Sequence, residues 1–542
     1  MLSRRNFIRT VGATAAARAQ APRRPNILLI LADDLGYSDL GCFGGEIETP
    51  NLDRLASSGT RFTQLYNNAR CCPSRAALMT GQHPHKVGMG NMVGGQAREG
   101  FPGYSGRVSG SAKFLPAVLR DSGYTTLMCG KWHLGQPGPI ERGFDEFYGM
   151  VHGFDSFWDA SKYTRLPAGR STQLLKGTFH ATDAITNHAL DFLQTARQSV
   201  LKPWFLYLAY NAPHFPLHAP KDLIDKYRKV YEQGWDVIRE KRFERMKTLG
   251  LVDPRWKMSP RSVVGPNRVS TANGWDVKQN PDWNSIPADR RTDLARRMAV
   301  FAAMVDQMDR NIGRVIEDLK AKRELDNTLI LFCSDNGACA EWDPWGFDVR
   351  SGPDNVLHTG ETLNEMGQPG TYHSYGSAWA NTGNTPWRLY KHYTHEGGIS
   401  TPCIVHWPNG LKIRQGGVRN EAWHFIDVLP TLAAVAGATA PADCAGVNMA
   451  PLFAGKSVKR GPLFWEHEGS RAVRDGKWKI TAMHPTGAWE LYDIDADRTE
   501  QNDLAAKYAE RVKRMAAQWE AWAKANGAVP WIWNPRYPAR TE

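Results

Sequence analysis

The sequence predicts an α/β fold: one large, mostly parallel sheet with helices on both faces, followed by a smaller antiparallel sheet that carries a helix. Two observations support this prediction. Up to residue 437, continuous apolar runs alternate with amphipathic helical segments, which is the pattern of strands buried on both faces. After about residue 460 the segments become short, aromatic-rich and separated by turns, as in antiparallel sheets.

The elements of the large sheet follow from this alternation. Strands are expected at five apolar or β-branched runs, namely 26–32, 124–129, 204–210, 328–333 and 402–407. The helices between and after them are expected at 50–59, 114–122, 181–198, 295–322 and 425–437. The first helix has clear boundaries, because Thr49-Pro50 supplies a capping hydroxyl and a first-turn proline, and Gly59 ends it.

The last part of the chain forms the second unit of this scheme. Its strands are expected at 463–467, 471–474, 477–482 and 488–493, with a closing helix over 503–526. We therefore expect a catalytic domain over 23–450 and a C-terminal subdomain over 451–542. Two irregular, tryptophan-containing segments, 250–290 and 338–386, fit functional rims better than scaffold. Six tryptophans of the chain could line an aryl or sugar site or pack in the core: Trp275, Trp283, Trp342, Trp345, Trp379 and Trp387.

The N-terminus is similar to a twin-arginine export signal over residues 1–19. Residues 3–9 (SRRNFIR) hold paired arginines, a mildly apolar stretch follows, and residues 17–19 (ARA) resemble a cleavage site. The alternative interpretation is a frayed basic terminus. The signal predicts the export machinery as a partner and a periplasmic or secreted location.

Composition narrows the class of protein. The 542 residues are 42% apolar and 23% charged, which excludes disordered, collagenous and small disulfide-framed proteins. No apolar run approaches the roughly 18 residues that span a bilayer, so an integral membrane protein is not expected. The net charge of +12 suits an anionic partner, but without a recognition motif it does not support nucleic-acid binding. The eight cysteines contain no repeated CxxC, so no zinc ribbon is expected.

Oxygen ligands follow two of the expected strands. Asp33 and Asp34 come directly after 26–32, and Asp335 and Asn336 come directly after 328–333. Since the carboxyl ends of parallel strands share one edge of a sheet, we expect the four side chains to meet there. Adjacent aspartates repel one another unless a cation lies between them, and an all-oxygen set suits Ca²⁺, or alternatively Mg²⁺. The alternative is that both pairs only form turns or cap helices.

A cysteine pair begins the most distinctive segment, residues 71–81 (CCPSRAALMTG). Pro73 and Ser74 favour a helix start, and a helix N-terminus places Cys71 in positive potential. Arg75, one turn along, could meet an anion. From the residues alone, this is either a nucleophile beside an anion site or simply a buried cysteine.

These residues resemble the signature of the type I, formylglycine-dependent sulfatases of the alkaline-phosphatase superfamily. Five further motifs match this family in its order, at 130–135 (GKWHLG), 212–214 (APH), 334–337 (SDNG), 388–391 (RLYK, continuing to 396–398, EGG) and 490–493 (ELYD). The matches run from Asp33 to about residue 504, and the stretch 211–253 is most similar to the bacterial arylsulfatase branch. The resemblance implies an alkaline-phosphatase-like fold and the cleavage of sulfate monoesters.

The resemblance also implies a mechanism. A separate maturation enzyme oxidises Cys71 to formylglycine, whose hydrate has two hydroxyls. One attacks the sulfate sulfur and displaces the alcohol; the other then loses its proton, and sulfate leaves. Arg75 and Lys131 hold the oxygens of the nucleophile, and His133 is the base of the second step. His214 and Lys391 bind sulfate and protonate the leaving oxygen.

Two alternatives remain beside this assignment. A phosphonate monoester or phosphodiester hydrolase would share the nucleophile and the fold. A sulfated-glycan-binding pseudoenzyme would show gaps in the catalytic set, and this sequence shows none. The leaving group, whether a phenol, an alkyl alcohol or a carbohydrate, is left open. Four other histidines are expected at the surface: His85, His152, His218 and His395.

Overall fold

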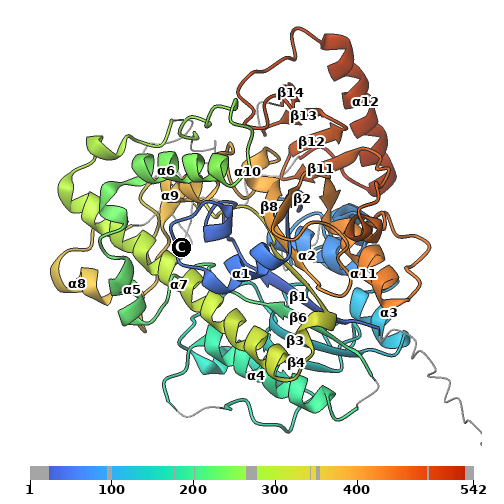
Figure 1. Cartoon of the computed structure of the whole chain (residues 1–542). Coiled ribbons are helices and arrows are strands. Elements are labelled where there is room, and N and C mark those ends of the chain that lie inside the picture. Colours follow the sequence, from blue (N-terminus) through green and yellow to red (C-terminus); the bar gives the residue numbers. More distant parts are fainter. Residues whose placement is uncertain are drawn as a thin grey trace, which may run out of the picture.

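The computed structural model describes residues 24–93, 100–174, 177–199, 202–263, 278–341, 343–349, 355–484 and 487–531. It contains one large sheet with its helices and a second, smaller sheet at one end (Figure 1). The expected export signal over 1–19 lies outside the described residues.

The large sheet has ten strands and is mixed but mostly parallel. Its centre is β1 (Asn26–Ala32), between β7 (Thr328–Ser334) and β6 (Trp204–Ala209), and β6 is followed by β3 (Thr125–Lys131) and β4 (Glu146–Met150). These five strands are parallel. Next to β7 lie β8 (Ser400–His406) and then β2 (Thr60–Tyr66), and β8 pairs antiparallel with both neighbours. The short strands β9 (Gly417–Arg419) and β10 (Trp423–His424) lie beside β2. At the other edge, β5 (Thr164–Leu166) pairs antiparallel with β4. The predicted fold class is confirmed.

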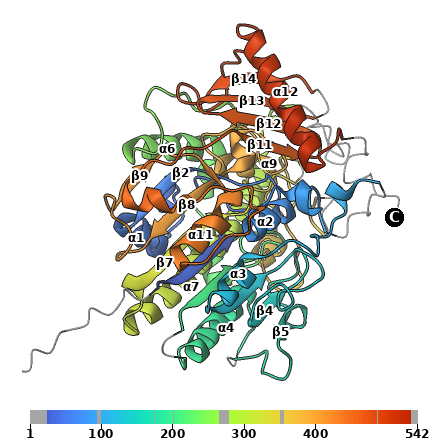
Figure 2. The same cartoon turned by 90° about the vertical axis from the view of Figure 1, so that its right-hand side faces the viewer.

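Helices cover both faces of this sheet (Figures 1 and 2). Alternate residues of β1 enter two separate apolar clusters: Leu28 and Ile30 lie in one, and Ile27 and Leu29 in the other. The first cluster includes residues of α1 (Pro50–Ser58), α4 (Ala181–Ala196), α5 (Lys221–Tyr227), α6 (Trp235–Thr248), α7 (Ala288–Ala321) and α9 (Gly376–Gly383). The second includes residues of α2 (Cys71–Thr80), α3 (Leu115–Asp121) and α11 (Val428–Ala436). Two short helices, α8 (Gly360–Glu365) and α10 (Glu396–Ile399), complete this part.

The second sheet is antiparallel, in the order β11 (Leu463–His467), β12 (Ser470–Asp475), β13 (Trp478–Ala482) and β14 (Glu490–Asp493). Helix α12 (Ala509–Asn526) packs on one face, where Val473 and Ile480 meet Trp519. Figure 2 shows this unit above the large sheet. The division at residue 450 stays a prediction. Among the described helices, none combines the length and apolar character that crossing a bilayer requires.

Some elements differ from the prediction. β2 was not expected, because its sequence TRFTQLY reads as polar; the strand is nevertheless internal, and Thr63 Oγ1 donates to Asn420 Oδ1 over 2.7 Å. α7 begins at Ala288 rather than at residue 295, and α12 begins at Ala509 rather than at residue 503. Element type was thus easier to predict than element ends.

A buried ionic network joins the two units. Lys479 Nζ on β13 lies 2.9 Å from Glu396 Oε1 on α10 and 2.8 Å from Glu500 Oε1. Arg498 Nε lies 2.7 Å from Glu396 Oε2. Burial opposes ionisation of Glu396, but Lys479 and Arg498 lower its pKa to about 2. Because every member has a partner of opposite charge, the cost of desolvating each charge is offset.

Removing one side chain of this network should therefore lower the stability of the fold. We expect Lys479→Ala to lower the free energy of unfolding, measured by urea denaturation, by about 3–5 kcal/mol, because buried Glu500 loses its lysine partner and Glu396 keeps only Arg498. The matched control is Lys477→Ala: this lysine pairs with Asp493 at the surface, and its loss should leave the midpoint unchanged. Equal midpoints for both variants would show that the network does not stabilise the fold.

Candidate active site

The four predicted oxygen ligands meet at the carboxyl edge of the large sheet. The register between β1 and β7 pairs Ala32 with Ser334, so the residues that follow the two strands are neighbours. Asp34 N donates to Asp335 Oδ1 over 3.3 Å, and Asn336 Nδ2 donates to Asp34 Oδ1 over 2.6 Å. All four side chains, including Asp33, are buried.

Three cationic side chains surround these oxygens. Lys131, the last residue of β3, places its Nζ 2.6 Å from Asp33 Oδ2. Arg75 of α2 lies 2.9 Å from Asp335 Oδ2 through Nη2 and donates through Nη1 to the Lys131 carbonyl over 2.7 Å. Lys391 Nζ lies 2.7 Å from Asp34 Oδ1. Burial alone would lower the pKa of Lys391, but Asp34 and smaller contributions from other nearby groups raise this pKa well above its ordinary value.

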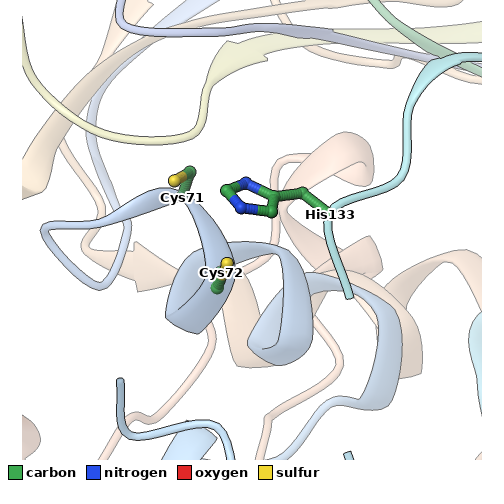
Figure 3. A group of neighbouring side chains, drawn as sticks. All are labelled: Cys71, Cys72 and His133. Atoms are coloured by element: carbon green, nitrogen blue, oxygen red, sulfur yellow. The ribbon is translucent and has the colours of Figure 1, made fainter. Parts of the chain in front are cut away.

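Cys71 is the first residue of α2 and is 1% exposed. Figure 3 shows the His133 ring reaching from the loop after β3 toward Cys71 and Cys72. One ligand atom of each of these three residues lies within 4.8 Å of the others. Burial opposes ionisation of the Cys71 thiol, yet Cys72, Lys131 and His133 together lower its pKa well below the ordinary value. Burial and the neighbouring Cys71 raise the pKa of Cys72, so the two thiols are chemically distinct.

The two predicted catalytic histidines lie on either side of this centre. His214 Nε2 is 3.3 Å from Asp34 Oδ2, and its Nδ1 is 2.6 Å from the Phe215 carbonyl. Burial lowers the pKa of His214 to about 3 and that of His133 to about 4. Both imidazoles are therefore neutral at neutral pH, and His133 can accept a proton.

Left-handed backbone flanks the site at non-glycine residues. Asp34 has φ 67° and His133 has φ 53°, while Leu389 and His392, on either side of Lys391, have φ 62° and 84°. Such conformations cost roughly 1–3 kcal/mol each, and the surrounding structure must hold them. Gly130 shows how close the packing is: a Cβ there would lie 1.7 Å from the Ala209 carbonyl oxygen of β6.

A cavity of about 640 Å³ lies beside His214. Phe154 lines it and stacks on His214, with ring centroids 5.5 Å apart and an interplanar angle of 16°. The opposite wall includes Tyr372 and His373, and His218 also lines the cavity. This volume lies within the range of small-molecule sites.

Several residues near the site carried no signal in the sequence. Phe154 belongs to no motif, and neither does Glu341, which lies 2.7 Å from Arg70 Nη1 and 3.9 Å from Lys391 Nζ. Glu341 is 50 residues from Lys391 in the sequence, so only the fold reveals that the two side chains are close.

The expectation of surface positions was wrong for three histidines. His85 is buried with its Nε2 2.6 Å from Glu466 Oε2, His395 is buried 3.0 Å from Glu490 Oε2, and His218 is buried beside the cavity. His152 is exposed as expected, with 52% of its side chain accessible.

The tryptophans divide between core and rim. Trp283, Trp379 and Trp387 pack in the core, which favours the packing interpretation for them. Trp345 is partly exposed, and Trp275 and Trp342 lie outside the described residues.

The fold and the site together define a hydrolase of the alkaline-phosphatase superfamily. The sequence model of the sulfatase family matches residues 25–438, and a second, for the C-terminal part of N-sulphoglucosamine sulphohydrolase, matches residues 385–524. The chain belongs to the sulfatase family and is a sulfuric ester hydrolase.

Relatives span nearly the full length of the chain. An uncharacterized sulfatase of Schizosaccharomyces pombe is 33% identical over 94% of this chain and 95% of its own length. An arylsulfatase of Klebsiella aerogenes is 33% identical over 78% of this chain and 88% of its own. The solved structure of Ps i-CgsB in complex with k-i-k-neocarrahexaose is 27% identical, covers 95% of each chain and has a TM-score of 0.66.

Gly153, which lies against the His133 ring, offers a test of the site geometry. A Cβ on Gly153 would lie 2.8 Å from two atoms of the His133 ring, so Gly153→Ala should displace one or the other. Because small misplacements at a reacting centre cost up to about 100-fold in rate, we expect kcat/KM for a sulfate ester to fall at least about tenfold. Gly110→Ala, where nothing lies within 4 Å, is the control and should retain full activity.

Proposed function

We propose that this sulfatase cleaves sulfate monoesters with a nucleophile derived from Cys71 and a divalent cation held by Asp33, Asp34, Asp335 and Asn336. One observation carries the proposal: the thiol at the start of α2, four oxygen ligands and three cationic side chains converge in one buried volume. The proposal includes maturation of Cys71 by a separate enzyme and export through the twin-arginine machinery to the periplasm or beyond.

The residues present fit a hard cation. Asp33 Oδ1 and Asn336 Oδ1 are buried without a hydrogen-bond partner among the described residues. Burial raises the pKa of Asp33 well above its ordinary value despite Lys131, and the neighbouring carboxylates add to the rise. A carboxylate that neighbouring carboxylates repel despite its contact with Lys131, and that has further oxygens around it, is what a cation would stabilise. Because these donors are all oxygens, Ca²⁺ or Mg²⁺ fits the set better than zinc does.

The side chains around position 71 then have distinct roles in the reaction. A bound cation would supply Lewis-acid polarisation of the sulfate oxygens, and formylglycine at position 71 would supply a hydrated aldehyde as the nucleophile. Arg75 and Lys131 orient the oxygens at position 71 and offset their charge. His133, neutral and in reach of residue 71, removes the proton that allows sulfate to leave.

The leaving group is assigned to the other side of the centre. Lys391, held in its charged form, donates hydrogen bonds to the sulfate and to the leaving oxygen. His214 donates from Nε2 only as the imidazolium, because in its neutral form the single N–H, at Nδ1, faces the Phe215 carbonyl. Beyond His214 the 640 Å³ cavity receives the alcohol. Its aromatic rim at Phe154 and Tyr372 suits an aryl or sugar group. A panel of aryl, alkyl and sugar sulfates measures this preference, and faster turnover of a phosphodiester under the same metal would favour the phosphodiesterase alternative.

The nucleophile is tested by mass spectrometry of the peptide spanning Cys71. We expect loss of the thiol and gain of an aldehyde at Cys71, with Cys72 unmodified, and complete loss of sulfatase activity in Cys71→Ala. Cys72→Ala is the matched control and should keep the aldehyde at position 71. An intact Cys71 thiol in fully active protein would overturn the mechanism.

The cation is tested through stability rather than activity. A ligand present at 100 times its Kd adds about 2.7 kcal/mol to the free energy of unfolding. We therefore expect Ca²⁺ to raise the melting temperature of chelator-treated protein, and Asn336→Leu, which removes one ligand oxygen, to abolish most of this rise. Asn91→Leu, at another buried asparagine, is the control; the same response in both variants would argue against the assigned ligands.

A further inference from the structure

A second group of metal-ligand side chains lies in the wall of the cavity beside His214. Asp348, His358 and His373 all line this cavity. Asp348 Oδ1 lies 2.5 Å from His373 Nδ1 and 3.0 Å from His358 Nε2. The two imidazole rings are nearly perpendicular, with centroids 4.9 Å apart, and the three potential donor atoms lie within 4.8 Å of one another.

The position of each donor is fixed by the surrounding chain. Asp348 and His373 face each other across an isolated antiparallel bridge. The other carboxylate oxygen of Asp348, Oδ2, accepts from Arg297 Nη2 over 2.8 Å and from Val356 N over 2.7 Å. His358 is held through its backbone, whose N–H donates to Asp293 Oδ1 over 3.2 Å. Such outer partners orient ligands in protein metal sites.

We propose that Asp348, His358 and His373 bind a divalent transition-metal ion of the Zn²⁺ type, with a further coordination position open to the cavity. Two imidazoles and one carboxylate form a ligand set that such ions prefer, and three protein ligands leave room for an exogenous one. Ca²⁺ and Mg²⁺ favour oxygen ligands and belong at the Asp33 centre instead. The site is therefore distinct from the catalytic cation in both place and chemistry.

The charges at the site suit a cation. Burial opposes ionisation of Asp348, but hydrogen bonds from His358 and His373 and the charge of Arg297 lower its pKa well below the ordinary range. The carboxylate is thus ionised, and its Oδ1 faces both imidazoles. Arg297 lies behind the carboxylate and is compensated by Asp293, 3.0 Å from its Nε.

Two other clusters of this kind do not support the same inference. At His392, the Nη1 atom of Arg70 contacts the imidazole nitrogen itself, so a cation already occupies that place. Cys71, Cys72 and His133 belong to the active site. Asp348, His358 and His373 differ in that the nearby arginine contacts the carboxylate oxygen that faces away from the imidazoles.

The position of this site in the cavity wall gives the ion a role in substrate binding. Phe154 lines the same cavity and stacks on His214, so an ion held by Asp348, His358 and His373 would lie in the wall of the cavity that receives the leaving group of a sulfate ester. Its open position would accept a hydroxyl or carboxylate oxygen of that group. The metal site itself does not depend on the proposed function, and only this last step does.

The experiment is a titration with Co²⁺, a coloured stand-in for Zn²⁺, of purified protein saturated with Ca²⁺. We expect one equivalent to bind with the visible absorption of a nitrogen–oxygen site, and His358→Ala and His373→Ala to weaken binding at least tenfold. His358 is the milder change, because its side chain is 14% exposed. His152→Ala, on an exposed histidine of the facing loop, is the matched control and should bind as the unaltered chain does.

Two further measurements complete the test. Co²⁺ should raise the melting temperature of the unaltered chain but not of His358→Ala, which excludes a folding defect as the cause of lost binding. Asp335→Asn should keep the Co²⁺ absorption, so a failure of the catalytic assignment is separable from a failure here. Absence of Co²⁺ binding to the unaltered chain, or equal binding by His358→Ala, overturns the proposal.

Discussion

The structure depends on holding like charges together without water. Asp33, Asp34 and Asp335 are buried at the ends of two adjacent strands, where each would repel the others. Lys131, Arg75 and Lys391 reduce this repulsion through short contacts with the carboxylates. Since the cations come from β3, α2 and the segment before α10, the balance of charge fixes how these elements meet. Asp34 and His133 themselves, and two residues that flank Lys391, have left-handed backbone, which the surrounding structure must hold in place.

The same principle recurs where the two sheets join. A second buried network of ion pairs consists of Glu396, Glu500, Lys479 and Arg498. Glu396 lies five residues after Lys391, so the C-terminal sheet supports the segment that carries Lys391. The smaller unit is therefore part of the support of the active site. Apolar packing of Trp465 and Ala472 against Tyr66 of β2 adds to the same junction.

The sequence predicted the parts of this design that are local. Five buried strands, their helices and the small antiparallel sheet follow from periodicity, and the meeting of Asp33 with Asp335 follows from strand topology. β2 was not predicted from the sequence, because Thr63 satisfies its buried hydroxyl through a distant residue, Asn420, which composition does not show. His85, His218 and His395 were misplaced for the same reason: a buried histidine needs a partner, and partners such as Glu466 lie hundreds of residues away. Phe154 and the Asp348 cluster depend on how loops fold back, and no spacing rule predicts that.

The burial of Cys71 has a consequence for the order of events in the life of the chain. At 1% exposure, beneath His133 and at the start of a packed helix, this thiol offers no surface to a second protein once folding is complete. Any enzymatic change at position 71 must therefore happen on a chain that is still open. The segments that close the site arrive late in synthesis: Lys391 comes 320 residues after Cys71, and its support at Lys479 and Arg498 comes later still. Translation itself thus leaves an interval in which residue 71 has been made but the later elements of the fold have not.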